Sequence, residues 1–195
     1  MNMTDDQLIA LSREGDHEAF KALIRKYESR VAATVIGMLG HGPDAEDVGQ
    51  EVFIRFYNSL SSFRGDSSVA TYLTRIAMNL SLNMLKSRKR RTLRFWEKPV
   101  EEHKDLADDT VTEYNGEKEL IRKAVQSLDP IFRSVIVLRL MEGYSTRETA
   151  EILKIPEGTV LSRLARAQKK LKEILLPYFG ENHERVHPRP APSVV

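Results

Sequence analysis

Residues 144–171 read YSTRETAEILKIPEGTVLSRLARAQKKL, a pattern that predicts two short helices joined by a tight turn. Ser145 is a preferred N-cap residue, and Glu148, three positions later, completes a capping box for the first helix. Pro156 falls at the junction, where proline lets a helix start but not easily continue. The stretch therefore has the organisation of a helix-turn-helix.

The second of these helices is basic and contains no acidic residue over 159–172. An apolar stripe with spacings of four, three and four residues follows one face: Val160, Leu164, Ala167 and Leu171. Small, polar and basic residues follow the opposite face: Ser162, Ala165, Arg166 and Lys169. Such a helix can enter a DNA major groove, and the alternative is an ordinary basic amphipathic hairpin. The capping box, the turn and the charge together favour DNA binding.

The composition bounds the class of protein. With 195 residues, of which 41% are hydrophobic, the chain can form one large domain or two small ones. Its net charge of +2 conceals segregation, because 86–94 holds six basic residues and no acidic one, whereas 96–119 holds nine acidic and three basic residues. Separate segments with opposite charge indicate separate partners.

Several classes are excluded or disfavoured by what the sequence lacks. Without cysteine the chain forms no disulfide, no cysteine-based zinc site and no thiol nucleophile, so a reducing cytoplasm is the expected location. No apolar run approaches the ~18 residues needed to span a bilayer, and the N-terminus lacks the features of a signal peptide. We therefore expect no membrane insertion, and no residue pattern calls for a cofactor.

Helical periodicity dominates and no convincing alternating strand is found, so the expected fold is all-α. The predicted helices are about 4–15, 17–39, 44–60, 69–91, 117–127 and 130–142, followed by the helix-turn-helix. We expect a first domain over 1–95, an acidic flexible linker over 96–116, a second domain over 117–180 and a disordered tail over 181–195.

The predicted helix at 44–60 carries two different faces. Its buried stripe consists of Ala45, Val48, Val52, Phe56 and Leu60. Its far side carries acidic and amide residues around one isoleucine: Asp47, Gln50, Glu51, Ile54 and Asn58. This combination indicates docking onto a basic, partly apolar protein surface, and the alternative is a solvated face with one stray apolar residue. A metal site among the carboxylates is disfavoured, because their helical angles scatter and the helix has no histidine.

The predicted helix at 69–91 adds a nucleic-acid surface. Its apolar face consists of Leu73, Ile76, Ala77, Leu80 and Met84. Beside it runs a polar stripe: Tyr72, Arg75, Asn79, Asn83, Lys86 and Arg90. Amides can pair with base edges, an aromatic ring can stack on an unpaired base, and cations neutralise phosphate. The alternatives are a surface helix whose cations complement the helix dipole, or a patch that binds RNA or a membrane.

Four motifs in order carry a family resemblance: 44–57 DAEDVGQEVFIRFY, 62–65 SFRG, 71–79 TYLTRIAMN and 155–164 IPEGTVLSRL. Together they resemble a bacterial RNA polymerase sigma factor of the sigma-70 family. The two-domain length is similar to that of the extracytoplasmic-function branch, group 4, and the match covers about residues 5–175. The resemblance implies an alternative sigma factor that binds core polymerase, directs it to −35/−10 promoters and helps to melt the duplex, without catalytic residues of its own.

The resemblance also implies roles for individual residues. The first domain, region 2, would dock on the β′ clamp helices through Asp47, Gln50, Glu51, Ile54 and Asn58. Its loop and following helix would recognise and melt the −10 element through Phe63, Arg64, Ser67, Tyr72, Arg75, Asn79, Asn83, Lys86 and Arg90. The second domain, region 4, would contact the β flap and read the −35 element through Thr159, Ser162, Arg163, Arg166, Lys169 and Lys170. The acidic linker would enter the active-site cleft, and an anti-sigma factor would hold both domains inactive.

Four positions depart from the family pattern. Tyr72 replaces the usual tryptophan but keeps a ring, and Gly49 replaces an apolar residue at ~1 kcal/mol of helix propensity relative to alanine. Lys154 replaces a glycine in the turn, so we expect mild strain there, and Leu161 replaces a basic residue. Two other functions fit the sequence less well: a stand-alone helix-turn-helix regulator, which leaves the first domain without a role, and a carboxylate-dependent nuclease, for which no catalytic cluster converges.

Overall fold

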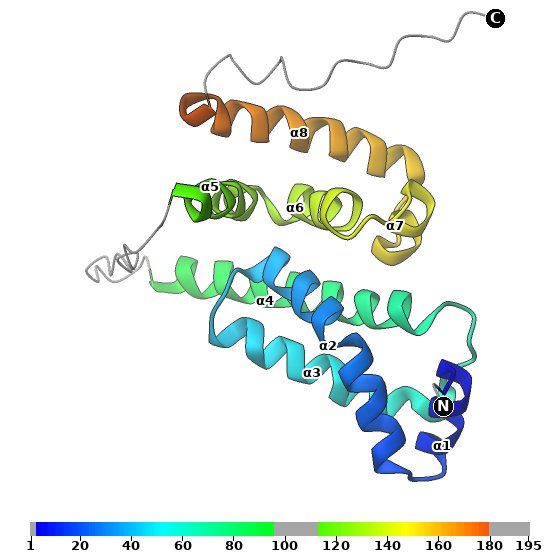
Figure 1. The fold of residues 1–195 in the computed structure, drawn as a ribbon. Coiled ribbons are helices and arrows are strands. Elements are labelled where there is room, and N and C mark those ends of the chain that lie inside the picture. Colours follow the sequence, from blue (N-terminus) through cyan, green and yellow to red (C-terminus); the bar gives the residue numbers. More distant parts are fainter. Residues whose placement is uncertain (1–2, 96–112, 180–195) are drawn as a thin grey trace, which may run out of the picture.

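The computed structural model describes residues 3–95 and 113–179, and this part of the chain consists of helices and turns without a strand (Figure 1). The all-α prediction is therefore confirmed for these residues. Most of the predicted acidic linker, 96–112, and the predicted tail, 181–195, lie outside the described residues.

The first domain is a bundle built around one buried cluster. It contains α1 (Asp5–Arg13), α2 (His17–Leu39), α3 (Pro43–Ser59), the short 3₁₀ helix η1 (Leu60–Ser62) and α4 (Val69–Phe95). Helices α2, α3 and α4 all pack on one another, and α1 packs on α2. The buried stripe predicted on α3 is confirmed, since each of its members is at most 6% exposed: Ala45, Val48, Val52, Phe56 and Leu60.

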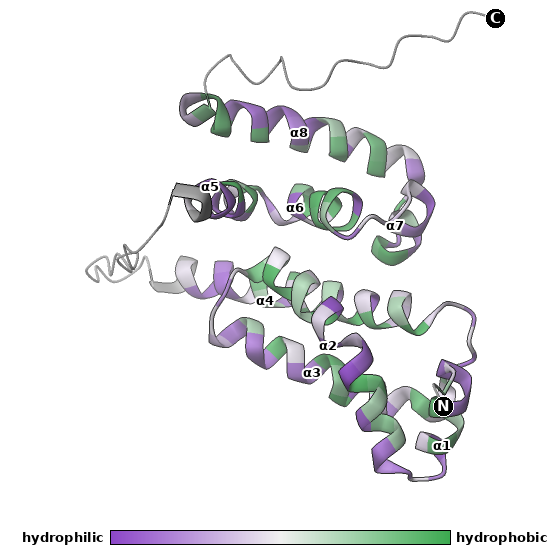
Figure 2. Ribbon diagram, viewed as in Figure 1, coloured by the Kyte–Doolittle hydropathy of each residue, from purple (hydrophilic) through white to green (hydrophobic). Residues whose placement is uncertain are grey.

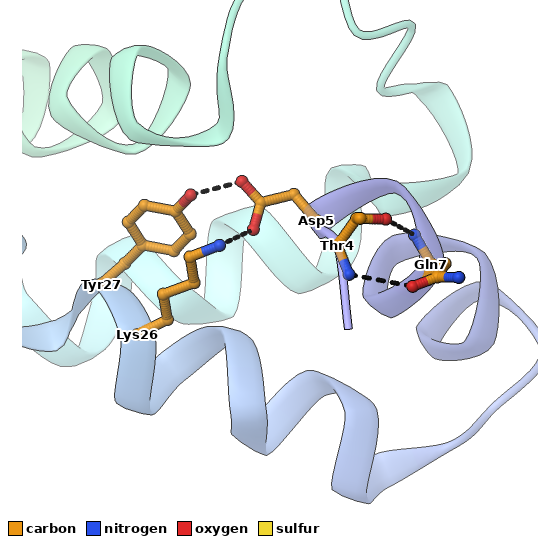
Figure 3. Close-up of polar contacts among 5 residues, drawn as sticks. All are labelled: Thr4, Asp5, Gln7, Lys26 and Tyr27. Atoms are coloured by element: carbon orange, nitrogen blue, oxygen red, sulfur yellow. Dashed lines mark hydrogen bonds and ion pairs between the residues drawn. The ribbon is translucent and has the colours of Figure 1, made fainter. Parts of the chain in front are cut away.

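Side-chain caps fix the N-terminal ends of α1 and α2. Thr4 and Gln7 form the predicted capping box, in which the Gln7 amide oxygen accepts from the Thr4 backbone N–H at 2.9 Å (Figure 3). Asp16 accepts from the N–H groups of Glu18 and Ala19 at the start of α2, also as predicted. Both caps satisfy backbone donors that a helix N-terminus would leave without partners.

Some predicted boundaries were wrong by a few residues. Helix α3 begins at Pro43 rather than at 44, because proline suits the first helical position, and α4 continues to Phe95 rather than ending at 91. Helix α5 (Glu113–Ser127) begins four residues earlier than predicted. The single helix expected over 130–142 is α6 (Pro130–Ile136) followed by a π-helical turn, η2 (Val137–Met141), in which Glu142 donates to the carbonyl of Val137.

The second domain consists of α5, α6, η2, α7 (Thr146–Leu153) and α8 (Glu157–Phe179). Helix α6 packs along α8, and α7 meets α8 through the turn between them. A second buried cluster holds these helices together: Val125, Leu128, Val135, Ile136, Ala150, Val160 and Ala167.

The two domains pack directly on each other. Helices α2 and α4 of the first domain contact α5, α6, η2 and α7 of the second, and α8 lies on the far side of α6 (Figure 1). Four residues of the second domain join the core of the first: Val137, Leu138, Tyr144 and Ile152. Helix α6, in the middle layer, is largely apolar, whereas α8 mixes hydrophilic and hydrophobic residues (Figure 2).

Candidate protein- and nucleic-acid-binding surfaces

The helix-turn-helix forms as the sequence predicts. Ser145 accepts from the backbone N–H of Glu148 at 3.2 Å, and the Glu148 carboxylate accepts from the Ser145 N–H at 2.8 Å. Hydrogen bonds from the side chain and the backbone of Ser145 to the Glu148 carboxylate lower the pKa of Glu148. Lys154 ends α7 in the left-handed conformation, with φ 54° and ψ 48°, which confirms the strained turn expected there.

Helix α8 presents the predicted polar face to solvent. Val160 and Ala167 are fully buried and Leu164 and Leu171 are half-buried, so the apolar stripe anchors the helix on α6 and α7. Of the six residues predicted to bind −35 DNA, two are half-buried, Thr159 and Arg163, and four are exposed: Ser162, Arg166, Lys169 and Lys170. Leu161, with 55% of its surface exposed, lies next to them.

Lys170 differs from the other cations of this helix. Its ammonium lies 4.0 Å from a carboxylate oxygen of Asp129 and 5.4 Å from the centre of the Phe132 ring. Both partners belong to the start of α6, so Lys170 is partly held against the body of its own domain. Lys169, in contrast, makes no ion pair with any residue in 3–95 or 113–179.

The predicted −10 surface follows α4 and the loop before it. Asn79, Asn83, Lys86 and Arg90 are exposed, as is Arg64 of the loop, while Ser67, Tyr72 and Arg75 are half-buried. This places the predicted amides and cations along one accessible side of the helix. Their contact with DNA stays a prediction.

Two aromatic residues of this surface are held by the core. The ring of Tyr72 lies 5.0 Å from that of Phe63 and 5.9 Å from that of Phe56, measured between ring centres. Phe63 is only 9% exposed. In this conformation Phe63 therefore acts as a packing residue that supports Tyr72, and contact with a base would require its ring to move.

Arg13 fixes the start of the loop before α4, a role for this arginine that the sequence did not indicate. From the end of α1 it donates its Nε to the carbonyl oxygen of Leu60 at 2.8 Å and its Nη2 to that of Phe63. Ser68 at the other end accepts from the backbone N–H of Thr71 at 3.1 Å, and so caps α4. Both ends of the loop over 63–68 are thereby anchored.

The predicted docking face on α3 is accessible. Asp47, Gln50 and Asn58 are exposed, Ile54 is 54% exposed, and Glu51 is half-buried in an ion pair with Arg55 at 2.7 Å. A largely apolar groove adjoins this face, lined by Phe20, Ile24, Gln50, Phe53, Ile54 and Tyr57. The contribution of α2 to this groove was missed, although Phe20 and Ile24 are spaced four residues apart as neighbours on a helix face.

The acidic start of α1 is tied to α2. Asp5 accepts from Lys26 at 2.6 Å and from the hydroxyl of Tyr27 (Figure 3). Burial raises the pKa of Asp5, but the hydrogen bonds from Lys26 and Tyr27 outweigh it, so that the pKa is lowered. Partial burial and the same contact raise the pKa of Tyr27. These residues position α1, and with it Arg13.

Neither a metal site nor a membrane span is found in the described residues. Within 3–95 and 113–179, no three histidine, aspartate or glutamate side chains are grouped so that they could hold a metal ion. None of the helices in the same ranges is both long and apolar enough to cross a membrane.

Comparison with known proteins matches the two domains separately. Residues 23–91 match the model for sigma-70 region 2, and residues 118–171 match that for sigma-70 region 4. The chain is 33% identical to the RNA polymerase sigma-H factor of Pseudomonas aeruginosa, over 91% of this chain and 96% of that protein. It is also 33% identical to the ECF RNA polymerase sigma-E factor of Escherichia coli, over 90% of this chain and 96% of that protein.

Two solved structures share the fold at 24% identity. The sigma factor RpoE from Bartonella quintana, solved with the anti-sigma factor NepR, gives a TM-score of 0.63 over 80% of this chain and 96% of that one. CnrH, solved with the cytosolic domain of CnrY, gives a TM-score of 0.64, and the match covers 89% of this chain and 98% of CnrH. Both regions match in order, and the identity to the two relatives extends over nine-tenths of this chain. The chain therefore belongs to the sigma-70 family of RNA polymerase sigma factors, in the extracytoplasmic-function branch.

Proposed function

We propose that this sigma factor docks on the β′ clamp helices of core RNA polymerase through the acidic and apolar face of α3. The support is the exposed Ile54, which follows Asp47 and Glu51 on the same face of α3, with the groove of α2 and α3 beside it. An exposed apolar residue next to carboxylates is typical of a surface that binds a basic, partly apolar partner. Asn58 and Gln50 extend the contact on the same helix.

The two DNA surfaces would then act on two promoter elements. Helix α8 would read the −35 element in the major groove, and α4 with its preceding loop would capture a base of the −10 element and stabilise the melted strand. We further propose contact of the second domain with the β flap.

The setting and the control of this activity are part of the proposal. The protein would act in the cytoplasm with its polymerase and would have no catalytic centre of its own. It would be held inactive by an anti-sigma factor. The support for such a partner is that the Bartonella quintana sigma factor, which shares this fold, forms a complex with the anti-sigma factor NepR.

The observation that carries the proposal is that one chain presents an accessible acidic docking face together with two separate basic surfaces. A stand-alone regulator needs only the second domain, and a nuclease needs a catalytic cluster. Within 3–95 and 113–179, no three histidine, aspartate or glutamate side chains are grouped so that they could hold the metal ion of a carboxylate-dependent nuclease.

The test combines binding with transcription. The full-length chain is mixed with bacterial core polymerase, the complex is isolated, and run-off transcripts are collected from a library of genomic fragments. We expect a stable complex and transcripts that depend on the chain. Tight binding to a duplex fragment with no association to polymerase would identify a regulator instead, and cleavage of the fragments with added Mg²⁺ would identify a nuclease.

A further inference from the structure

A leucine lies on the side of α8 that faces solvent. Leu161 is 55% exposed, whereas its sequence neighbour Val160 is fully buried. In the part of the chain that the structure describes, Leu161 belongs to neither buried cluster, and it is not among the partly buried residues that pack against them. Its side chain therefore contributes little to the fold and is available for a partner.

The residues on either side of Leu161 along the helix face are small. Gly158 lies three positions before it and Ala165 four positions after it, so both share its side of α8, and both are exposed. A Cβ on Gly158 would have no heavy atom within 4 Å. A large side chain between two small ones projects furthest from the helix. Leu161 can therefore reach a surface that its neighbours do not block.

The cations of the same turns lie on another side of the helix. Within 157–167 these cations are Arg163 and Arg166, and Ser162 lies between Arg166 and Leu161 around the exposed face. Glu157, which is exposed, lies four positions before Leu161 and shares its side. Phosphate repels a carboxylate and attracts cations. The edge of α8 that carries Leu161 is therefore suited to base edges rather than to the sugar-phosphate backbone.

In a DNA major groove a leucine side chain can recognise one chemical feature. The groove edges of the bases present hydrogen-bond donors and acceptors, and the apolar group among them is the C5-methyl of thymine. Leucine against a donor or acceptor would remove water from that group and supply no hydrogen bond in return. Against a thymine methyl, the same contact buries apolar surface on both partners. Leu161 is the fifth residue of α8, and the N-terminal residues of a recognition helix are those that contact bases.

We propose that Leu161 is a specificity-determining residue of α8, which selects an A·T pair in the −35 element through the C5-methyl group of its thymine. The inference rests on the proposed function, since it requires α8 to lie in the major groove. Ser162 and Arg166 would read neighbouring pairs by hydrogen bonds. The Ser162 hydroxyl donates to the carbonyl oxygen of Thr159 at 3.1 Å, so its lone pairs remain to accept a bond from a base.

Removal of one methyl group from the DNA tests this contact. The −35 element is first selected from a library of random duplexes with the full-length chain and core polymerase. Each thymine of the selected element, on either strand, is then replaced by deoxyuridine, which lacks the methyl and keeps every hydrogen-bonding group. Competition against the unmodified fragment measures the affinity. We expect a position at which deoxyuridine lowers the affinity of the wild type about fourfold, the ratio that corresponds to about 0.8 kcal/mol for one buried methyl.

Substitution of Leu161 should remove this discrimination. Leu161→Ala should bind the thymine and deoxyuridine fragments equally at that position, and a repeated selection should lose the preference for A·T there. Leu161→Met keeps a large apolar side chain and should retain the discrimination. Leu176→Ala is the matched control, because Leu176 is 46% exposed on the same helix and should be unnecessary for it. All three variants should keep the helicity of the wild type, since both leucines are exposed.

Cytosine methylation provides the reverse test. Cytosine in place of thymine at the same position lacks the methyl group, and 5-methylcytosine restores it on an otherwise unchanged cytosine. We expect the wild type to bind the 5-methylcytosine fragment about fourfold more tightly than the cytosine fragment. Leu161→Ala should bind the two equally. Equal binding of both fragments by the wild type would contradict the proposed contact.

Three further results would overturn the inference. The first is equal affinity of the wild type for thymine and deoxyuridine at every A·T pair of the element, and the second is a deoxyuridine effect of the same size in Leu161→Ala. The third is a selected element without an A·T pair. A contact of Leu161 with sugar or with a protein would give one of the first two results. A −35 preference that is independent of methyl groups would leave the proposed function standing, whereas the lack of any −35 preference would overturn the proposed function itself.

Discussion

The hydroxyl groups of Tyr144 and Thr74 lie 2.8 Å apart although 70 positions separate the two residues in the sequence. Tyr144 precedes the helix-turn-helix, and Thr74 lies on the helix that carries the predicted −10 surface. This hydrogen bond therefore joins the two units that are predicted to bind DNA. The predicted docking face on α3 lies outside this contact and is accessible.

Charge reversal at the docking face should weaken polymerase binding. Asp47→Lys with Glu51→Lys removes two carboxylates from a face that we expect to meet basic residues. Folding should change little, because Asp47 is exposed and the ion pair of Glu51 is with the exposed Arg55 on the same helix. Affinity for core polymerase, measured by fluorescence anisotropy, should fall, and the gap from wild type should narrow as salt rises. Glu14→Lys with Glu173→Lys changes the net charge equally at other exposed sites. Equal affinity of the two double variants would show that this face of α3 does not bind polymerase.

Promoter opening should depend on Asn79 and Tyr72. Asn79→Ala removes an exposed amide and should reduce open complexes while −35 binding remains. Loss of the Tyr72 ring should cost ~1–3 kcal/mol of base stacking, and Tyr72→Phe, which keeps the ring, serves as its control. A template with a pre-melted bubble should restore much of the loss, as measured by run-off transcription from the duplex and the pre-melted templates. A full defect on the pre-melted template would show that these residues act elsewhere.

Substitutions on α8 should distinguish residues that read bases from residues that bind phosphate. Arg166 is exposed near the centre of the predicted DNA face, where arginine can form two hydrogen bonds to a guanine edge. Arg166→Ala should cost ~1–3 kcal/mol on the best −35 sequence and relax the preference at one base position. Lys169→Ala and Lys170→Ala should weaken binding to all DNA sequences alike. The effect of Lys170→Ala should be smaller, because the ammonium of Lys170 already interacts with Asp129. Selection from a −35 library tests this, and unchanged preferences with Arg166→Ala would reduce Arg166 to a phosphate contact.

The contact of Asp5 with Lys26 and Tyr27 should make the stability of α1 depend on pH. The pKa of Asp5 is lowered in the folded state, so its ionised form stabilises the fold at pH values above the unfolded pKa of 3.8. This contribution is lost as the pH falls through the folded pKa. Asp5→Asn should therefore be less stable than wild type at pH 6, and the gap should close towards pH 3, as measured by urea unfolding. Asp6→Asn is the matched control, and a gap that does not change with pH would contradict the assignment.

Local features of this chain could be predicted from its sequence. Capping residues act within three positions of the backbone they bind, so Thr4, Asp16 and Ser145 mark helix starts. The apolar stripe of α3 and the left-handed Lys154 follow from the same short-range rules. Exposure of the amides and cations on α4 and α8 follows from helical periodicity, because the opposite faces are apolar.

Features that depend on distant residues could not be predicted. Phe63 has the sequence context of a DNA-binding loop, yet its ring is buried against Phe56 and Tyr72. The bond of Arg133 to Met38 spans 95 positions, and no local pattern distinguishes this arginine from an exposed one. The groove beside Ile54 required knowledge of how α2 crosses α3.

Mapping of transcript starts is the decisive test of promoter selection by this chain. Core polymerase with and without the full-length chain transcribes fragmented genomic DNA, and the 5′ ends are sequenced. We predict starts that depend on the chain and share two upstream elements, near −35 and −10, at constant spacing, and loss of these starts when that spacing is changed by about half a helical turn. Start sites that are the same without the chain, or that share no upstream element, would contradict the account.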